Sequence, residues 1–149
     1  MRIPKQVLII PYRVINNEIQ YCIFKRKDLN VWQWISGGAE DFDSDILETA
    51  KREFYEETGI DDVEIKKLEL ETKIPVVNIV KDFIWEKDIF YAEEYAFSAD
   101  INNKQIKLSD EHEEYKWLSC EEAKKLLKYD SNKSALWELD VKLKRRMKK

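Results

Sequence analysis

The sequence predicts an α/β fold in which a central mixed sheet is flanked by helices. Segments rich in β-branched and aromatic residues alternate along the chain with segments of helical periodicity. Hydrophobic residues make up 44% of the chain, which is enough for a sizeable core, and neither an internal repeat nor a low-complexity linker interrupts it. Because 149 residues suit one compact domain and are too few for two ordinary ones, we expect a single domain over residues 1–149.

Two paired strands are expected at the start of the chain, over residues 6–14 and 19–25, where β-branched and aromatic residues are frequent. The two asparagines at 16–17 lie between them, and asparagine tolerates the backbone geometry of a tight turn. A short third strand is expected over residues 31–35. The Ser-Gly-Gly segment at 36–38 follows it, and we expect these glycines to end the strand.

A helix is expected next, over residues 45–58. Asp43 or Ser44 can cap its start, because a short polar side chain accepts a hydrogen bond from the first turn, and Gly59 is placed to end it. Further strands are expected at 63–74, 87–99 and 114–118, and closing helices at 119–129 and 131–147, each with a serine at or near its start.

Charge and cysteine content argue against several classes of protein. The formal net charge of −4 offers no general attraction to nucleic acid, so a bound phosphate must be met by a local cation. The basic segment 142–149 is better explained as a solvated helix end than as an RNA contact. No apolar run approaches the roughly 18 residues of a membrane span, and Cys22 and Cys120 form no disulfide framework. We therefore expect a cytoplasmic protein with neither a membrane nor a stable nucleic-acid partner.

Three glutamates lie together on the expected helix. At about 100° per residue, Glu57 falls inside the apolar stripe, Glu53 lies at its edge, and Glu56 lies about 60° to the other side of Glu53. A carboxylate turned toward a packed sheet is costly unless a cation or hydrogen-bond donors compensate it. The pattern indicates a divalent cation, and magnesium is suited when phosphates share its coordination. The alternative is a solvated acidic face with Lys51 and Arg52 as salt partners.

Residues 38–60 read GAEDFDSDILETAKREFYEETGI and resemble the Nudix box, a pattern of Gly, five residues, Glu, seven residues, then Arg-Glu-aliphatic-x-Glu-Glu-x-Gly-aliphatic. One position departs from it: Ser44 stands where the family has a Glu that lies near the metal site or pairs with the Arg. Acidic residues within 40–45 could substitute for that Glu. The matching residues are Gly38, Arg52, Glu53, Glu56, Glu57, Gly59 and Ile60, with Phe54 at the bulky apolar position.

The resemblance implies an α/β/α sandwich whose helix presents Mg²⁺ or Mn²⁺ to a diphosphate. It makes Glu53 and Glu57 principal metal ligands, and Glu56 a third ligand or part of the base machinery. Arg52 would orient these carboxylates by charge-assisted hydrogen bonds, and the backbone carbonyl of Gly37 would complete the coordination. In this family the cation offsets the phosphate charge and activates a water for in-line attack on phosphorus.

Segments outside the box resemble the dihydroneopterin triphosphate pyrophosphatase branch of the same family. They include residues 2–12, 25–37 and 111–118, together with Ser131 and its neighbours. On this likeness Glu111 is a further metal ligand and the candidate general base, with Glu113 and Glu114 behind it on the chain. The residues that fall where the branch contacts its substrate are Arg2, Arg26, Ser36 and Ser131. Arg26 offers phosphate a planar fork of donors, although it also fits the surface end of a strand.

Aromatic residues offer candidate walls for a base or pterin ring. Trp32 and Trp34 alternate on one face of the expected strand at 31–35, and we assign Trp34 to the substrate site, with core packing as the alternative for at least one of them. Phe83 and Trp85 share the same spacing and would form a second wall. The chain's one histidine, His112, is interpreted as an incidental neighbour of Glu111.

These expectations combine into a function. We expect a Mg²⁺-dependent hydrolase that cleaves dihydroneopterin triphosphate or a nucleoside triphosphate to a monophosphate and pyrophosphate, with no partner but this small molecule and a homodimer left open. A decapping or dinucleoside polyphosphate hydrolase keeps the chemistry and changes the substrate. A nucleotide-binding module that does not hydrolyse its ligand is the alternative from another class, motivated by Ser44.

Overall fold

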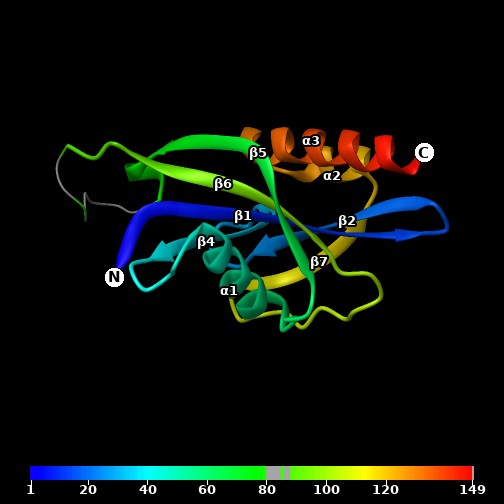
Figure 1. The fold of residues 1–149 in the computed structure, drawn as a ribbon, viewed down its shortest axis with the longest axis horizontal. Coiled ribbons are helices and arrows are strands. Elements are labelled where there is room, and N and C mark those ends of the chain that lie inside the picture. Colours follow the sequence, from blue (N-terminus) through cyan, green and yellow to red (C-terminus); the bar gives the residue numbers. More distant parts are fainter. Residues whose placement is uncertain (80–84, 86–87, 149) are drawn as a thin grey trace.

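The computed structural model describes residues 1–79, 85 and 88–148. It has helices on both faces of a mixed sheet, which confirms the predicted fold class. Figure 1 shows α1 on one side of the sheet and α2 and α3 on the other. The strands are β1 (Arg2–Ile15), β2 (Glu18–Arg26), β3 (Trp32–Gln33), β4 (Ile35–Glu40), β5 (Glu64–Pro75), β6 (Tyr91–Asp100) and β7 (His112–Leu118); the helices are α1 (Ile46–Thr58), α2 (Cys120–Leu126) and α3 (Asp130–Met147), with a 3-10 turn at Val76–Asn78.

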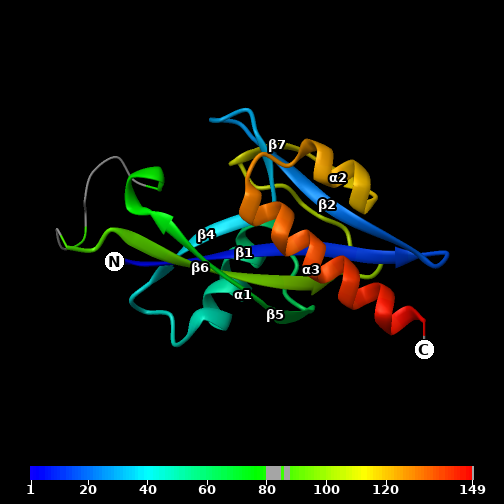
Figure 2. The same cartoon turned by 90° about the horizontal axis from the view of Figure 1, so that it is seen from above.

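Within the described residues the strand order is β3-β2-β1-β6-β5, with β4 added to β1 and β7 added to β2. β1 and β6 are parallel, and the other pairs of these strands are antiparallel. β1 pairs with β4 along its first half and with β2 along its second half. The sheet therefore divides where β4 and β2 leave β1, and α3 runs obliquely across the strands beside this division (Figure 2).

The turn between β1 and β2 has the backbone that its sequence predicts. Asn16 and Asn17 both have positive φ, 52° and 64°, and Ile15 pairs directly with Glu18. A two-residue hairpin loop with two positive φ values matches the twist of the flanking strands. This confirms the expected pair of strands at the start of the chain.

Alternate residues of β1 enter two separate cores. Val7 and Ile9 pack with Phe54 of α1 in one core, whereas Leu8 packs with Leu136 of α3 in the other. This follows from the alternation of side chains along a strand. Because burial of an aromatic side chain such as Phe54 contributes about 1.5–3 kcal/mol, the apolar stripe of α1 is held firmly on the sheet.

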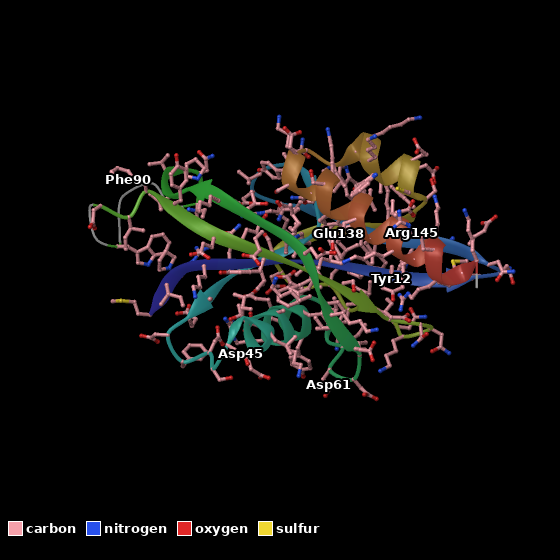
Figure 3. All side chains as sticks on the ribbon, turned by 45° about the horizontal axis from the view of Figure 1, so that its top comes forward. Tyr12, Asp45, Asp61, Phe90, Glu138 and Arg145 are labelled. Atoms are coloured by element: carbon pink, nitrogen blue, oxygen red, sulfur yellow. The ribbon has the colours of Figure 1, made fainter. Side chains whose placement is uncertain are left out.

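α3 also holds the edge strand β5 through a side chain. The pairing of β5 with β6 shifts register between Lys67 and Glu71. Within this irregular stretch the backbone N–H groups of Glu69 and Leu70 donate to the Glu138 carboxylate, at 2.6 and 3.0 Å. Figure 3 labels Glu138 on α3, where the helix passes over β5. The bulge thus has its backbone donors satisfied.

The prediction that the glycines at 36–38 end a strand is wrong, because β4 runs through them to Glu40. The break lies earlier, at Trp34, between β3 and β4. A Cβ built on Gly37 would lie 2.1 Å from Glu53 Cδ, and one built on Gly38 would lie 2.2 Å from Arg2 Nε. Glycine in a strand marks a close approach, and here two charged side chains fill the space.

Several other boundaries differ from expectation. The N-cap of α1 is Asp45, whose side chain accepts from Glu48 N at 2.9 Å, rather than Asp43 or Ser44 (Figure 3). Gly59 ends the helix as predicted, with φ 73°. β1 begins at Arg2 and not at residue 6, and α2 ends at Leu126 and not at residue 129. β6 begins at Tyr91, later than the strand expected over 87–99, of which residue 87 lies outside the described residues. Among the described helices, none is both long and apolar enough to cross a membrane.

Candidate active site

The glutamates of α1 face the directions that the helical periodicity predicts. Glu57 is 3% exposed and lies among the buried residues of the helix. The side chain of Glu53 is 13% exposed, whereas that of Glu56 is 53% exposed. Glu53 lies against the backbone of Gly37, where an added Cβ would collide with its carboxylate. The structure therefore brings Gly37, Glu53 and Glu57 of the predicted metal site to one end of the interface between α1 and the sheet.

Arg52 is held by an acidic residue that the box pattern does not contain. Its Nε donates to Asp43 Oδ1 at 3.2 Å and its Nη2 to Asp43 Oδ2 at 2.9 Å. Arg52 also donates to the carbonyl of Gly38 at 3.1 Å and to Glu53 Oε1 at 3.0 Å. A forked contact of this kind fixes the orientation of the guanidinium. Asp43 thus supplies the carboxylate for Arg52 that Ser44 lacks.

Asp43 is itself fixed by two further donors. Its Oδ2 accepts from Glu40 N at 2.9 Å and from the hydroxyl of Thr49 at 2.8 Å. The hydrogen bonds from Arg52 are the main reason that the pKa of Asp43 is lowered to about 2. These bonds explain why Asp43 does not cap α1 and why Asp45 does so instead.

The low pKa of Asp43 predicts an acid-labile contribution to stability. Because its folded-state pKa lies below the ordinary value of 3.8, ionised Asp43 stabilises the fold above pH 3.8 or so, and this stability is lost as the pH falls toward 2. In metal-free buffer, thermal melts followed by circular dichroism should show a steeper loss of Tm over this range for the parent than for Asp43→Asn. Parallel pH profiles for the two proteins would contradict the assignment.

His112 is part of the acidic cluster, so its interpretation as an incidental neighbour of Glu111 is wrong. It is buried, and its Nδ1 lies 2.6 Å from Glu57 Oε2. The hydroxyl of Ser109 donates to the same oxygen at 2.7 Å. The ring of His112 packs on that of Phe24, with centroids 5.5 Å apart. Alternation along β7 would have missed it, because Tyr115 and Trp117 pack in the core under α1 and lie an odd number of residues from His112. A register shift between Lys25 and Arg26 of the paired strand β2 brings His112 to that face instead.

Burial and mutual repulsion set the electrostatics of the cluster. Burial, followed by repulsion from Glu56, raises the pKa of Glu53 to about 7. A hydrogen bond with Glu57, together with burial, raises the pKa of Glu111. Burial alone would also raise the pKa of Glu57, but the contacts with His112 and Ser109 outweigh it and lower that pKa. The four carboxylates are therefore close enough to repel one another.

This donor set fits Mg²⁺ or Mn²⁺, which prefer carboxylate and carbonyl oxygens. Burial is the main cause of the raised pKa of Glu53, and the hydrogen bond with Glu57 is the main cause for Glu111; repulsion between carboxylates adds to both, and a divalent cation would offset that repulsion. Across residues 1–79, 85 and 88–148, no three His, Cys, Asp or Glu side chains already form a cation cage. A magnesium ion bound here would take a few protein ligands and complete its coordination with water and substrate phosphate.

A cavity of about 720 Å³ opens beside these carboxylates, at the division of the sheet. Arg2, Arg26, Ser36 and Ser131, the residues predicted to contact substrate, all line it. The structure thus brings these four together with the acidic cluster. Arg26 pairs at 2.5 Å with Asp28, which also lines the cavity. Other lining residues are Gln6, Leu8, Lys27, Leu29, Gln33, Gly37, Gly38, Glu53, Glu56, Ile74, Asn78, Ile79, Glu94, Asp110, Glu111, His112, Tyr129 and Asn132.

Trp34 does not belong to this cavity, and its assignment to the substrate site is wrong. The residue is fully buried in the core beneath α3, where its ring meets Tyr21 edge to face with centroids 6.4 Å apart. Its Nε1 donates to Asn132 O at 2.9 Å, and its backbone N donates to Asn132 Oδ1 at 3.0 Å. Trp34 therefore positions the start of α3 instead of stacking on a ligand.

The other aromatic candidates have different outcomes. Trp32 packs against the same core and lies under the ammonium group of Lys116. Trp85 donates through Nε1 to the carbonyl of Arg2 at 2.8 Å, so it reaches the cavity end of β1. Phe83, the proposed partner of Trp85 in a second wall, lies outside the described residues.

The chain matches the NUDIX domain family over residues 9–138. The asymmetrical bis(5'-nucleosyl)-tetraphosphatases of Mus musculus and Sus scrofa are 31% and 32% identical, over 83% and 85% of this chain and 80% and 82% of their own length. Among solved structures, a Listeria monocytogenes protein described as a NUDIX hydrolase is 38% identical, with 97% of each chain covered and a TM-score of 0.85.

A dihydroneopterin triphosphate pyrophosphohydrolase from E. coli is 23% identical over 91% of this chain and 93% of its own, with a TM-score of 0.74, a likeness of fold alone. The family match spans most of the chain and includes α1, with its glutamates beside the cavity. The chain therefore belongs to the NUDIX family and is a Nudix hydrolase, an enzyme that cleaves pyrophosphate bonds.

Proposed function

We propose that the enzyme is a magnesium-dependent pyrophosphohydrolase that converts dihydroneopterin triphosphate or a nucleoside triphosphate to a monophosphate and pyrophosphate. The observation that carries this proposal is the acidic cluster of α1 beside a cavity that two arginines line. Carboxylates hold a cation and arginines bind phosphate, so the two together suit a polyphosphate. Because β1 and α3 both contribute to the cavity, we also propose that residues 1–149 work as one domain.

The residues that would hold the cation are Glu53, Glu56, Glu57 and Glu111, with the carbonyl of Gly37. When bound, the cation supplies positive charge to the phosphate oxygens and makes a water more acidic. Arg52, fixed by Asp43, keeps the Glu53 carboxylate in place. His112 and Ser109 do the same for Glu57, since both contact its Oε2.

Arg2 and Arg26, which both line the cavity, would bind the polyphosphate. Arg26 would exchange its exposed contact with Asp28 for a phosphate, which is favourable because surface ion pairs are weak. Glu111 would accept a proton from the attacking water as the new O–P bond forms. The bond to the leaving pyrophosphate breaks on the opposite side of phosphorus. The products are a monophosphate and pyrophosphate, and the proton ends on Glu111.

A second candidate substrate is a dinucleoside polyphosphate, which would use the same chemistry. It is supported by the asymmetrical bis(5'-nucleosyl)-tetraphosphatases at 31% and 32% identity. Specificity depends on a few side chains in the cavity rather than on the fold. The two candidates differ in their products, since only a triphosphate substrate releases inorganic pyrophosphate.

The test is a product analysis with purified enzyme comprising residues 1–149. Dihydroneopterin triphosphate, dATP, GTP and diadenosine tetraphosphate are each incubated with the enzyme, once with millimolar Mg²⁺ and once with a chelator in its place. Ion-exchange chromatography then identifies the products. We expect magnesium-dependent release of pyrophosphate from one or more triphosphates. Hydrolysis of the tetraphosphate alone would favour the second candidate, and hydrolysis of none would contradict both.

A further inference from the structure

A buried carboxyl group lies in the cavity wall away from α1. Glu94 of β6 is 5% exposed, lines the cavity, and pairs across the sheet with Gln6 of β1. Gln6 Nε2 donates to Glu94 Oε2 at 2.5 Å. Burial raises the pKa of Glu94, and Gln6 and the nearby Ser131 hydroxyl offset part of that rise. The hydrolysis described above makes no use of Glu94. A carboxyl group in such a place is costly to bury unless it meets hydrogen-bond donors.

The neighbouring amide has a defined orientation. Arg2 Nη2 donates to Gln6 Oε1 at 3.4 Å, so the amide oxygen faces Arg2 and the amide nitrogen faces Glu94. An amide nitrogen carries two N–H groups, and a carboxylate offers about four acceptor sites on its two oxygens. A ligand in the cavity therefore meets a donor from Gln6 directly beside an acceptor from Glu94.

We propose that Glu94 and Gln6 recognise the heterocycle of the substrate by the edge that guanine and pterin share. That edge presents a carbonyl oxygen, a ring N–H and an exocyclic amino group in a row. The Glu94 carboxylate accepts from the ring N–H and the amino group, and Gln6 donates to the carbonyl oxygen. This inference rests on the proposed function, because it names the heterocycle of the same substrate.

Adenine presents the opposite pattern at the corresponding edge. Its ring nitrogen carries no hydrogen, so a lone pair would face a Glu94 oxygen and leave that oxygen without a donor. An unsatisfied buried acceptor costs more than a hydrogen bond gains. A bidentate contact between a side chain and a base edge discriminates against the wrong base for the same reason. The pair therefore selects against adenine as well as for the shared edge.

The location of Glu94 matches the dimensions of such a substrate. Gln6 pairs with Gly38 on one side and with Glu94 on the other. Adjacent strands are about 4.8 Å apart, so the backbones of Glu94 and Gly38 are separated by roughly 10 Å. Arg2 packs on Gly38, and Glu53 packs on Gly37. Glu53 and Arg2 therefore lie together at the end of the cavity proposed for the phosphates, and the distance from there to Glu94 leaves room for the sugar or side chain before the ring.

Apolar side chains complete this end of the cavity. Leu8 lies on the same face of the sheet as Gln6, and Ile74 and Ile79 line the cavity from β5 and the segment that follows it. A flat heterocycle with polar groups along one edge needs apolar contacts on its faces and hydrogen bonds at that edge. The cavity provides both around Glu94.

The test compares Glu94→Gln with Glu93→Gln. Glu93 is the exposed neighbour on β6, so the control makes the same chemical change on the opposite face of the strand. A glutamine at 94 offers one donor and one acceptor, which suits adenine. We expect the ratio of kcat/KM for GTP and dihydroneopterin triphosphate to that for ATP to fall roughly tenfold to a hundredfold in Glu94→Gln, and to be unchanged in Glu93→Gln.

Binding of the products separates this inference from the proposed function. Calorimetric titration with GMP, with dihydroneopterin monophosphate and with AMP reports on the ring and needs no turnover. We expect Glu94→Gln to weaken binding of the first two compounds relative to AMP, whether or not the enzyme cleaves triphosphates. Parallel effects on GMP and the pterin indicate recognition of the shared edge, whereas an effect on one alone identifies that compound as the ligand.

Equal weakening of GMP, pterin and AMP binding, or no binding of any of them, would overturn the inference. Thermal melts of each variant establish that it is folded. If Glu94→Gln fails to fold, Gln6→Leu provides the same comparison from the donor side. An unchanged ratio in a folded variant means that the pair of side chains has only a structural role.

Discussion

Replacing Glu53 with Gln is expected to lower kcat/KM for pyrophosphate-bond hydrolysis by roughly a thousandfold, since a metal ligand contributes several kcal/mol of charge stabilisation in the transition state. The substitution keeps the shape that packs against Gly37 and removes the charge. Initial rates at saturating Mg²⁺ measure the effect. Glu48→Gln, an exposed change on the same helix, is the matched control and should retain activity.

The same substitution should not destabilise the metal-free fold. Burial raises the pKa of Glu53 to about 7, above its ordinary value of 4.5, so the folded state binds this proton more tightly than the unfolded state. Stability from this residue therefore declines as the pH rises through 7. In metal-free buffer at pH 8, Glu53→Gln should melt at the same temperature as the parent or higher. Loss of activity with a strongly lowered Tm would instead mean that Glu53 serves the fold.

Replacing Asp43 with Ala is expected to lower kcat/KM by roughly a hundredfold, the effect of removing a residue that orients metal ligands. Asp43 makes the forked contact with Arg52, and Arg52 in turn donates to Glu53. Without Asp43, the Arg52 guanidinium is free to move away from the carbonyl of Gly38 and from the loop that follows β4. Because Asp43 acts through other residues, the change should also raise the Mg²⁺ concentration needed for half-maximal rate.

Two comparisons distinguish this positioning role from a loss of stability. Asp41→Ala removes an exposed carboxylate that contacts the N-terminal amino group, so it should alter neither rate nor magnesium dependence. Asp43→Asn keeps the size of the side chain and one acceptor oxygen, so it should recover part of the rate. A folded Asp43→Ala enzyme with parental kinetics would show that Arg52 needs no partner at this position.

Local patterns predicted the parts of the site that one element determines. The period of α1 predicted that Glu57 faces the core, and the structure has it 3% exposed. The asparagine pair predicted the first hairpin. In both cases the relevant geometry is repeated within a single helix or turn, so spacing in the sequence is enough.

Features that depend on contacts between distant elements were not accessible from the sequence. Period-two alternation predicted that Trp34 shares one face of its strand with Trp32. It did not predict that α3 would cover that face. Acidic residues around Ser44 offered several partners for Arg52, and only the path of the chain from β4 to α1 selects Asp43. Likewise, His112 and Glu94 gained their roles from neighbours far away in sequence, Glu57 and Gln6.

The proposed activity requires that the carboxylates of α1 bind divalent cations that engage a polyphosphate. Calorimetric titration of Mn²⁺ into the parent enzyme and into Glu53→Gln, in the presence of a non-hydrolysable triphosphate analogue, measures this binding directly. We expect saturable Mn²⁺ binding in the parent and parental binding in Glu48→Gln. Binding in Glu53→Gln should be weaker by about tenfold or more, the order expected for a lost ligand. Identical Mn²⁺ affinity in all three proteins would contradict this requirement.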